Sequence, residues 1–434
     1  MRKILLFLFA ALSGLGQDFV CSGQDETPPR FKLYGFVANH MVFDTREVSA
    51  GAQDMFFFMP KDVKLSDDVD QNANPSFRML ALTSRVGLNV SSYRIGETKV
   101  DANIEGDFYC MNGSAATLRM RQAYVGISRN NLLVNVGQTW HPMAADMPHV
   151  NYEESGSPFN PFNWSPQIMA NWTSGKFTWT GGILYPMQFL PTGPSGKSAD
   201  YNKYGMIPEV YLGIAYKSGG FVGKAGVDLF SIMPRWEGPF ITGAYISDGV
   251  KTLEYDTSTK ELVTTRLFAV SPFVFLQYTK GMFQVKAKSV LAQAGEHMNL
   301  LSGYGPTFDW AGMKISYTPM QDWTSFISFQ YGKQFRFMAM AGYMQRLGTT
   351  KKLLGYEDPA VSSIWLNNAV DTRIQKAFRA TPTLVYNLGK LTFSLEYNCT
   401  AGWFGEGDYN VGGLYATGHW VMNHRIEQMV KFDF

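Results

Sequence analysis

The last residues of the chain, Trp420–Phe434, read WVMNHRIEQMVKFDF. The large apolar residues Trp420, Met422, Ile426, Val430, Phe432 and Phe434 all fall on one parity, whereas Arg425 and Glu427 fall on the other. A period of two is that of a β-strand with one apolar and one polar face. A tilted strand crosses a bilayer with about 9 to 11 residues, so this segment predicts a membrane-crossing strand with aromatic side chains at both ends.

A strand that ends on an aromatic residue at the carboxyl terminus resembles the terminal signal of bacterial outer-membrane barrels. The resemblance implies that Phe434 is an assembly signal, read by the barrel-assembly machinery. The alternative is an ordinary sandwich strand that happens to be the last one in the protein. The rest of the chain must decide between the two.

The composition favours the barrel. The chain has 434 residues, of which 45% are hydrophobic and 15% aromatic, together with 42 glycines. Its mean hydropathy is only −0.13, as expected when apolar and polar residues alternate along strands. The charged fraction is 17% and the formal net charge is +2, which argues against nucleic acid as a partner.

The first residues predict an export signal. Arg2 and Lys3 precede an apolar run at 4–12 that is too short to span a membrane as a helix. Cleavage after Gly23 fits the need for a small residue, and cleavage after Gly16 is the competing site. The expected organisation is a signal peptide at 1–23, a short periplasmic lead at 24–30 and a transmembrane β-barrel with long extracellular loops at 31–434.

The spacing of the strands predicts how they are connected. We expect about sixteen, the clearest at 31–44, 77–91, 99–109, 118–128, 132–140, 176–185, 207–217, 221–232, 283–292, 310–318, 323–334, 379–387, 391–400 and 420–434. Every second connection is short, including a tight turn at 319–322, and those between are mostly long, including loops at 233–264 and 335–378. Such alternation is typical of transmembrane barrels, and closure leaves no unpaired strand edge in lipid. The predicted fold is all-β, a closed antiparallel barrel.

A barrel of this size has a water-filled lumen, so the residues of interest are those that narrow it. The segment 141–165 contains four prolines and carries Asp146, Glu153 and Glu154. Either it folds inward as a constriction or it is an exposed surface loop. The candidate wall residues opposite an inward loop are Arg85, Arg119 and Arg121. Pairing of these arginines with Glu105 and Asp107 on the adjacent strand is the alternative.

Catalytic and metal-binding patterns are weak, and we expect no enzyme activity, no cofactor and no metal. The sequence contains neither HExxH nor GxSxG, and its six histidines show no close ligand spacing. An outer-membrane esterase needs only a serine and a histidine near the rim, so His424 is the remaining catalytic alternative. The aromatics at strand ends, Trp140, Trp172, Trp323, Tyr331 and Trp420, are expected in the interfacial girdles.

Five segments resemble DcaP-like outer-membrane porins: FRMLALTSRVGLNV (Phe77–Val90), IEGDFY (Ile104–Tyr109), LRMRQAYVGI (Leu118–Ile127), VGQTW (Val136–Trp140) and RIQKAFRATPTLVY (Arg373–Tyr386). The resemblance implies a homotrimeric diffusion channel that favours small anionic solutes such as dicarboxylates. The sequence departs from some members by lacking an N-terminal coiled-coil extension, which bears on how a trimer would form.

The sequence therefore predicts a porin of the bacterial outer membrane that passes small hydrophilic, anionic solutes through a water-filled pore. Its expected partners are those solutes, outer-membrane lipid and two further copies of the chain. Two alternatives stay open at this point. One is a substrate-specific channel that works with a lipoprotein partner, and the other is a surface adhesin or structural barrel.

Overall fold

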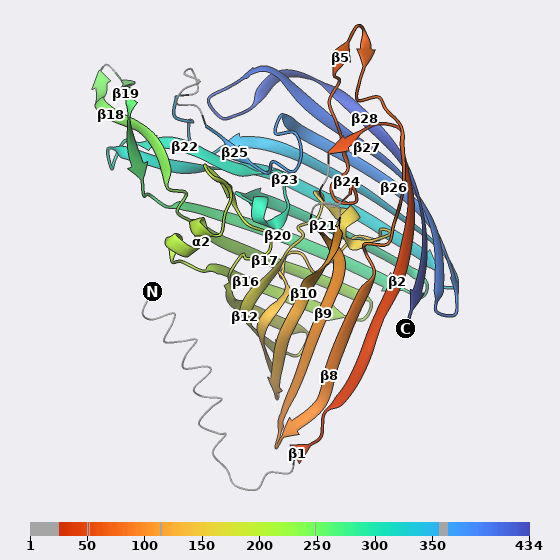
Figure 1. Ribbon diagram of the computed structural model, residues 1–434. Coiled ribbons are helices and arrows are strands. Elements are labelled where there is room, and N and C mark those ends of the chain that lie inside the picture. Colours follow the sequence, from red (N-terminus) through yellow and green to blue (C-terminus); the bar gives the residue numbers. More distant parts are fainter. Residues whose placement is uncertain (1–25, 50, 52, 113–114, 248, 356–362) are drawn as a thin grey trace.

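A computed structural model describes residues 26–49, 51, 53–112, 115–247, 249–355 and 363–434. The expected signal peptide at 1–23 lies outside these residues. Within the described part of the chain, sixteen long antiparallel strands form one closed barrel (Figure 1). They are β2 Arg30–Asp44, β8 Arg85–Ile95, β9 Thr98–Asn112, β10 Ala115–Arg129, β11 Leu132–Trp140, β12 Trp164–Ser174, β13 Phe177–Leu184, β16 Glu209–Ser218, β17 Phe221–Ile232, β20 Leu267–Lys280, β21 Phe283–Gln293, β23 Lys314–Gly332, β24 Phe335–Thr349, β26 Ile374–Leu388, β27 Leu391–Tyr409 and β28 Tyr415–Asp433.

The barrel closes between its first and last long strands. β2 pairs with β28 in a continuous register from Phe36 opposite Asp433 to Asp44 opposite Arg425. A short strand before the barrel, β1 Glu26–Thr27, pairs with the end of β8. Closure satisfies the backbone groups of every wall strand, which a bilayer requires. The predicted closed antiparallel barrel is confirmed.

The last strand has the two faces that its period predicts. On the outer face Trp420, Ile426 and Phe432 are 48%, 50% and 45% exposed, whereas Arg425 and Glu427 on the inner face are buried. Large apolar side chains are exposed along the outer faces of the other strands as well. An apolar outer surface on a closed barrel is that of a protein that spans a membrane with strands. No helix among the described residues is long and apolar enough to do so.

The second predicted strand is interrupted. In place of one strand at 77–91, the structure has β7 Ser76–Leu80 and then β8, separated by a turn. The hydroxyl of Ser84 accepts a hydrogen bond from the Ala38 N–H at 3.1 Å and donates to the Ala38 carbonyl at 3.3 Å. The Ser84 side chain therefore bonds to backbone groups of β2 that a continuous strand would bond with its own backbone. The alternation of apolar residues does not reveal this interruption.

The predicted tight turn at 319–322 is wrong. β23 runs without a break from Lys314 to Gly332, and β24 lies inside the segment that the sequence assigns to the longest loop. The true turn is at 333–334, after Gly332, whose φ of +114° disfavours any other residue. The prediction divides β23 into two strands and misses β24, so the predicted number of strands is right although the bounds of several strands are not.

The long segments between the wall strands contain further short elements. The predicted loop at 233–264 is a hairpin of β18 Trp236–Ser247 and β19 Val250–Val263. The remaining short elements are β3 Val48–Ser49, β4 Met59–Pro60, β5 Leu65–Ser66, β6 Val69–Asp70, η1 Glu153–Gly156, β14 Thr192–Gly193, β15 Gly196–Lys197, α2 Asp200–Gly205, η2 Glu296–Met298, β22 Gly303–Asp309 and β25 Trp365–Leu366.

Candidate functional site: the inward-folded loop and the lumen

The segment between β11 and β12, residues 141–163, folds into the barrel; we call it the inner loop. Most of its residues are buried, and the side chains of Phe159 and Phe162 are fully so. Phe162 packs edge-to-face on Trp140 and Trp164, with ring centroids 5.3 and 5.0 Å apart. Trp140 therefore lies in this inner aromatic cluster and not in the outer girdle, which corrects the expectation for that residue.

Side chains from the opposite wall hold the inner loop by its backbone. Arg379 of β26 donates to the carbonyl oxygens of Ser155 and Ser157, at 2.6 and 2.9 Å. Lys288 of β21 donates to the carbonyl of Met143 at 2.8 Å and to the Asn160 side chain at 2.7 Å. Buried carbonyl groups need donors of this kind. The loop is therefore fastened across the lumen at both of its ends.

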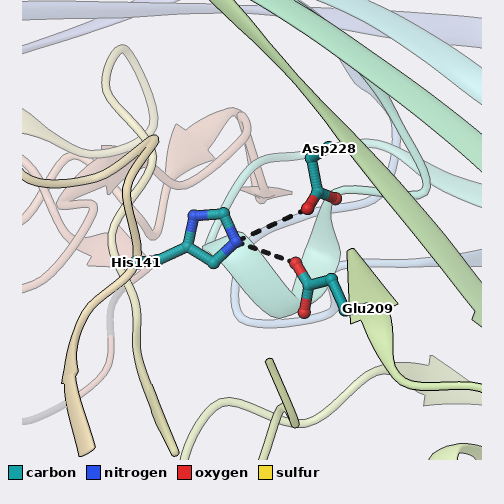
Figure 2. Close-up of side chains that lie close together, drawn as sticks. All are labelled: His141, Glu209 and Asp228. Atoms are coloured by element: carbon teal, nitrogen blue, oxygen red, sulfur yellow. Dashed lines mark hydrogen bonds and ion pairs between the residues drawn. The ribbon is translucent and has the colours of Figure 1, made fainter. Parts of the chain in front are cut away.

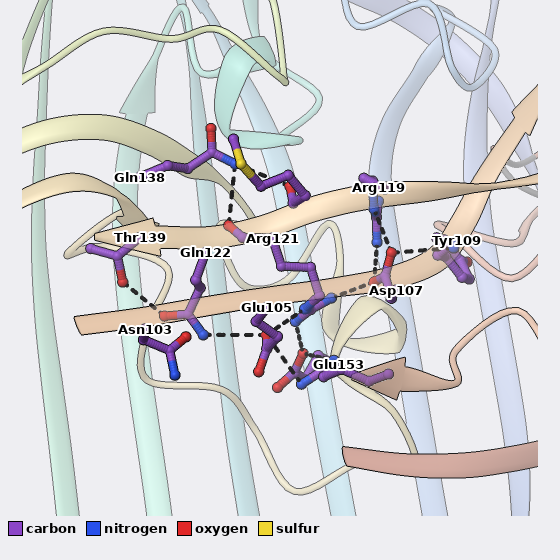
Figure 3. A network of polar contacts seen from close by, with 12 residues as sticks. Asn103, Glu105, Asp107, Tyr109, Arg119, Arg121, Gln122, Gln138, Thr139 and Glu153 are labelled. Carbon is purple, nitrogen blue, oxygen red and sulfur yellow. Dashed lines mark hydrogen bonds and ion pairs between the residues drawn. The ribbon is translucent and has the colours of Figure 1, made fainter. Parts of the chain in front are cut away.

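The near wall contributes a network of charges to the same loop (Figure 3). The guanidinium of Arg121 on β10 lies 2.9 Å from Glu105 and 2.8 Å from Asp107, both on β9, and also bonds to Glu153 of the inner loop. Arg85 on β8 reaches Glu153 at 2.8 Å. Although burial alone raises the pKa of Glu153, Arg121 and Arg85 lower it to about 2.

Arg119 completes this network. It forms a bidentate pair with Asp107, at 2.9 and 2.7 Å, and reaches Glu154 of the inner loop at 3.3 Å. Its guanidinium carbon also lies 4.7 Å from the centre of the Trp164 ring. Planar, multidentate recognition of this kind suits arginine and not lysine. The polar faces of β9 and β10 and the inner loop thus form one cross-braced unit.

Seven of the eight predicted site residues belong to this network: Arg85, Glu105, Asp107, Arg119, Arg121, Glu153 and Glu154. The eighth, Asp146, lies apart and pairs with Lys224 of β17 at 2.7 Å. The sequence left open whether the arginines face an acidic loop or pair with carboxylates of the next strand, and the structure contains both contacts. Because opposite charges touch here, no wide gap separates an acidic loop from a basic wall at this place.

A cavity of about 330 Å³ lies beside the inner loop, and we call it the vestibule. Its lining includes the basic residues Arg85, Arg336 and Lys431. Arg336 is partly exposed and makes no hydrogen bond or ion pair with any described residue. Lys286 of β21, also partly exposed, donates to the Met147 carbonyl at 3.0 Å and forms no close ion pair with the described residues; the nearby Asp146 is paired with Lys224.

His149 of the inner loop also lines the vestibule. Burial, together with the positive charges of Lys286 and Arg336, lowers the pKa of His149 to about 3. The imidazole is therefore neutral at physiological pH. Sequence reasoning singled out neither Arg336 nor Lys286 as a site residue, because only the three-dimensional position of the inner loop shows which lumen cations lack a partner.

The outer face carries no comparable network around His424, the residue of the catalytic alternative. Its Nδ1 lies 2.7 Å from the Tyr397 hydroxyl on the adjacent strand, and the two rings stack. The cysteines Cys110 and Cys399 are both free thiols. The inner loop and the vestibule are therefore the candidate functional site.

Comparison with known proteins bears on the fold. No protein-family model matches the chain, and no curated protein matches it in sequence. Among solved structures, the outer-membrane channel DcaP of Acinetobacter baumannii is similar, with a TM-score of 0.64, 17% sequence identity, and coverage of 96% of this chain and all (100%) of that one. OmpT of Vibrio cholerae has a TM-score of 0.53 at 11% identity, covering 95% of this chain and 100% of its own.

An anion-selective porin from Comamonas acidovorans is similar to the same degree, with a TM-score of 0.53, 11% identity, and coverage of 94% of this chain and 100% of that chain. At these identities the likeness concerns the fold. The structural similarity confirms that the fold resembles that of the DcaP channel, as the sequence predicts. A closed, membrane-spanning barrel of this fold places the chain in the bacterial outer membrane, as the sequence predicts.

Proposed function

We propose that the protein is a porin through which small hydrophilic anions diffuse passively. The observation that carries the proposal is the pairing of lumen charges around the inner loop. Glu105, Asp107, Glu153 and Glu154 are bonded to arginines, whereas Arg336 and Lys286 form no close ion pair with any described residue. The free charge that a solute meets beside the inner loop is therefore positive.

The local charge matters more than the total. The net charge of the whole chain is only +2, and charges more than about 8 Å from a solute are largely screened at physiological salt. A narrow passage with low-dielectric walls concentrates the field of its nearest charges. Arg336 and Lys286, on β24 and β21, therefore have more influence on selectivity than the distant surface charges.

The comparisons with solved structures add support to the proposal, which rests on the charges beside the inner loop. One structural neighbour is described as anion-selective and another as an outer-membrane channel. The sequence resemblance to DcaP-like porins implies small anions such as dicarboxylates as solutes. A pair of unpartnered cations suits a solute with two carboxylates, because each carboxylate can meet one positive charge.

A homotrimer is part of the proposal. One of the similar OmpT structures is described as a trimer form, and the sequence resemblance implies the same assembly. The protein should migrate as a high-mass band in mild detergent and as a single chain after heating. A chemical cross-linker that yields only single chains from native membranes would contradict a trimer.

Conductance in a planar bilayer tests the channel itself. A porin conducts steadily at modest voltage, because its lumen is open at rest. A barrel that serves as an adhesin, with the inner loop as a plug, conducts no current. A channel that depends on a lipoprotein partner transports its solute only when that partner is present. Steady current from the purified chain alone, with diffusion of small anions into liposomes, is the expected result.

A further inference from the structure

A short hairpin, formed by β5 and β6, projects beyond the end of the barrel wall in Figure 1. We call residues 63–69 the hairpin tip. Two of its apolar side chains, Leu65 and Val69, are 66% and 61% exposed. Asp67 and Asp68, which join the two strands, are exposed as well and form no ion pair with any described residue. The tip is therefore both apolar and acidic, and the described part of its own chain covers neither feature.

The base of the hairpin is held firmly, so the tip has a fixed position. The buried guanidinium of Arg46 donates to the carbonyl oxygens of Lys61 and Asp62, at 2.7 and 2.9 Å. It also pairs with Asp70 at 2.6 Å. The Asp62 carboxylate in turn lies 2.8 Å from Arg373, the residue before β26. A segment that is ordered before it binds loses less conformational entropy on binding.

The apolar side chains lie on both faces of the hairpin. Leu65 is opposite Asp70, and Val69 is opposite Ser66. Cross-strand pairs share a face and successive residues alternate, so Leu65 and Val69 point to opposite sides. Packing on one flat surface covers only one of these sides. Insertion into a cavity covers both.

A cavity of about 790 Å³ lies elsewhere on the chain, and we call it the lysine cavity. Its walls come from β19, from β22 and the turn that follows it, and from the segment after β24. The large apolar residues of its lining are Leu253, Tyr255, Phe308, Trp310, Leu353 and Leu354. The rings of Phe308 and Trp310 pack edge to face, with centroids 5.0 Å apart. The cavity is large enough for several side chains and has an aromatic wall.

The rim of the lysine cavity is positively charged. Lys251, Lys351 and Lys352 are all exposed, and none of them forms an ion pair with any described residue. The Lys251 ammonium lies 5.3 Å from the centre of the Trp310 ring. Asp309 is the one carboxylate among the described residues of the lining. The rim therefore has the charge opposite to that of the acidic hairpin tip, next to an apolar interior.

The hairpin tip and the lysine cavity lie at the same end of the barrel. The hairpin follows β2, and the segments that form the cavity follow β17, β21 and β24. These four strands run in the same direction within the antiparallel wall. In Figure 1 the hairpin lies on the side of β28, whereas β19 and β22 lie across the barrel from it. A neighbouring copy with the same orientation in the membrane can bring the two surfaces together.

The most deeply buried charges of the wall take no part in such a contact. Figure 2 shows His141 between Glu209 and Asp228, and each of the three side chains is at most 1% exposed. The Nε2 atom of His141 lies 2.8 Å from the Glu209 carboxylate. A side chain of another copy does not reach groups inside the wall. The charges that a second copy meets are exposed ones, such as those of the tip and the rim.

We propose that the hairpin tip of one copy inserts into the lysine cavity of a second copy, with its two acidic residues at the lysine rim. The inference rests on the homotrimer of the proposed function. Leu65 and Val69 exchange water for an apolar lining, and unpaired carboxylates meet unpaired ammonium groups. Because the tip and the cavity are different surfaces, the contact is heterologous, and three copies close it into a ring.

Photo-cross-linking of the purified full-length protein in mild detergent tests the contact. With p-benzoylphenylalanine in place of Leu65, we expect cross-linked bands of two and three chains on a denaturing gel. The cross-linked peptide of the second chain should contain residues 251–255 or 307–310. The control has the same photoreactive residue in place of Lys176, which is exposed in the turn between β12 and β13 at the opposite end of the wall. It should give no link to these residues.

Charge reversal gives a second readout, the temperature at which the high-mass band dissociates. Asp67→Lys with Asp68→Lys should lower this temperature, because it places like charges at the contact. Adding Lys351→Glu with Lys352→Glu should raise it again, because opposite charges then meet with their signs exchanged. All of these residues are exposed, so the variants should fold, and heat-dependent electrophoretic migration of the single chain checks that they do.

The matched control combines the same tip variant with Lys217→Glu and Lys280→Glu, two exposed lysines at the opposite end of the wall. It should not raise the dissociation temperature. Trimers whose cross-links from position 65 fall outside both ranges, or equal dissociation temperatures in all variants, would overturn the docking and leave the homotrimer standing. Single chains alone in the parent protein would overturn the homotrimer and the docking with it.

Discussion

Arg121 on the inner wall of the barrel bonds directly to Glu153 of the inner loop. The guanidinium is fully buried and has three further carboxylate neighbours, Glu105, Asp107 and Glu154. This one side chain therefore links two adjacent strands to the segment that crosses the lumen. The position of the inner loop therefore depends on Arg121 as well as on Arg379 and Lys288.

Replacing Arg121 should release the inner loop. Arg121→Ala leaves the carboxylates of Glu105, Asp107 and Glu153 close together and short of a partner, and removal of one partner from a buried pair costs about 3–5 kcal/mol. Movement of the loop toward solvent relieves that repulsion. We expect larger single-channel conductance, a lower temperature of unfolding and a shift of selectivity toward cations.

The control for this variant is Arg94→Ala, which removes an exposed arginine near the carboxyl end of β8. It should leave conductance and thermal stability as they are in the parent protein. Unchanged conductance in Arg121→Ala, in molecules that fold, would show that the other contacts of the loop hold it without Arg121.

Acid should loosen the inner loop through His149. The pKa of this imidazole is lowered from 6.5 to about 3 by burial, with Lys286 and Arg336 acting in the same direction. A displaced loop binds a proton below pH 6.5 and the docked loop does not, so docking is fully stable above 6.5 and weakens as the pH falls toward 3. Conductance should change over that interval. His149→Gln, which cannot gain the charge, should remove this component of the change, and an identical pH profile in the variant would contradict the role of His149.

Loss of the terminal residue should impair assembly and not the pore. Phe434 donates its backbone N–H to the Gly35 carbonyl at 3.0 Å, and its side chain is 41% exposed on the outer face, far from the inner loop in the lumen. Deletion of Phe434 should therefore reduce the amount of protein in the outer membrane, measured by immunoblot of membrane fractions. Molecules that do assemble should conduct like the parent. Normal membrane levels of the truncated chain would argue against the assembly signal.

The alternation of side chains predicts most of the wall, because a strand in a bilayer must place apolar residues on one face only. β11 and β17 have the predicted bounds. The predicted strand boundaries are wrong where a single residue gives a local signal that disagrees with the alternation of side chains. Pro319 suggests a turn, yet it lies within β23, opposite Tyr304 of β22. The hydroxyl of Ser84 interrupts a strand whose apolar pattern is continuous.

Sequence reasoning predicts the wall residues of the site but not the position of the inner loop. Arg119 and Arg121 alternate with apolar residues, so their inward direction follows from the period of the strand. Whether the inner loop would reach them does not follow, because residues 141–163 contact strands on every side of the barrel, as far as Glu396 and Arg379.

The reversal potential under a gradient of KCl tests the central claim, that unpaired cations beside the inner loop make the pore prefer anions. The parent channel should be anion-selective, and Arg336→Gln with Lys286→Gln should shift its reversal potential toward that of a cation-preferring pore. The control, Lys217→Gln with Lys280→Gln, removes as much positive charge from exposed positions at the carboxyl ends of β16 and β20 and should change the reversal potential little. Equal reversal potentials in the parent and in Arg336→Gln with Lys286→Gln would contradict the account.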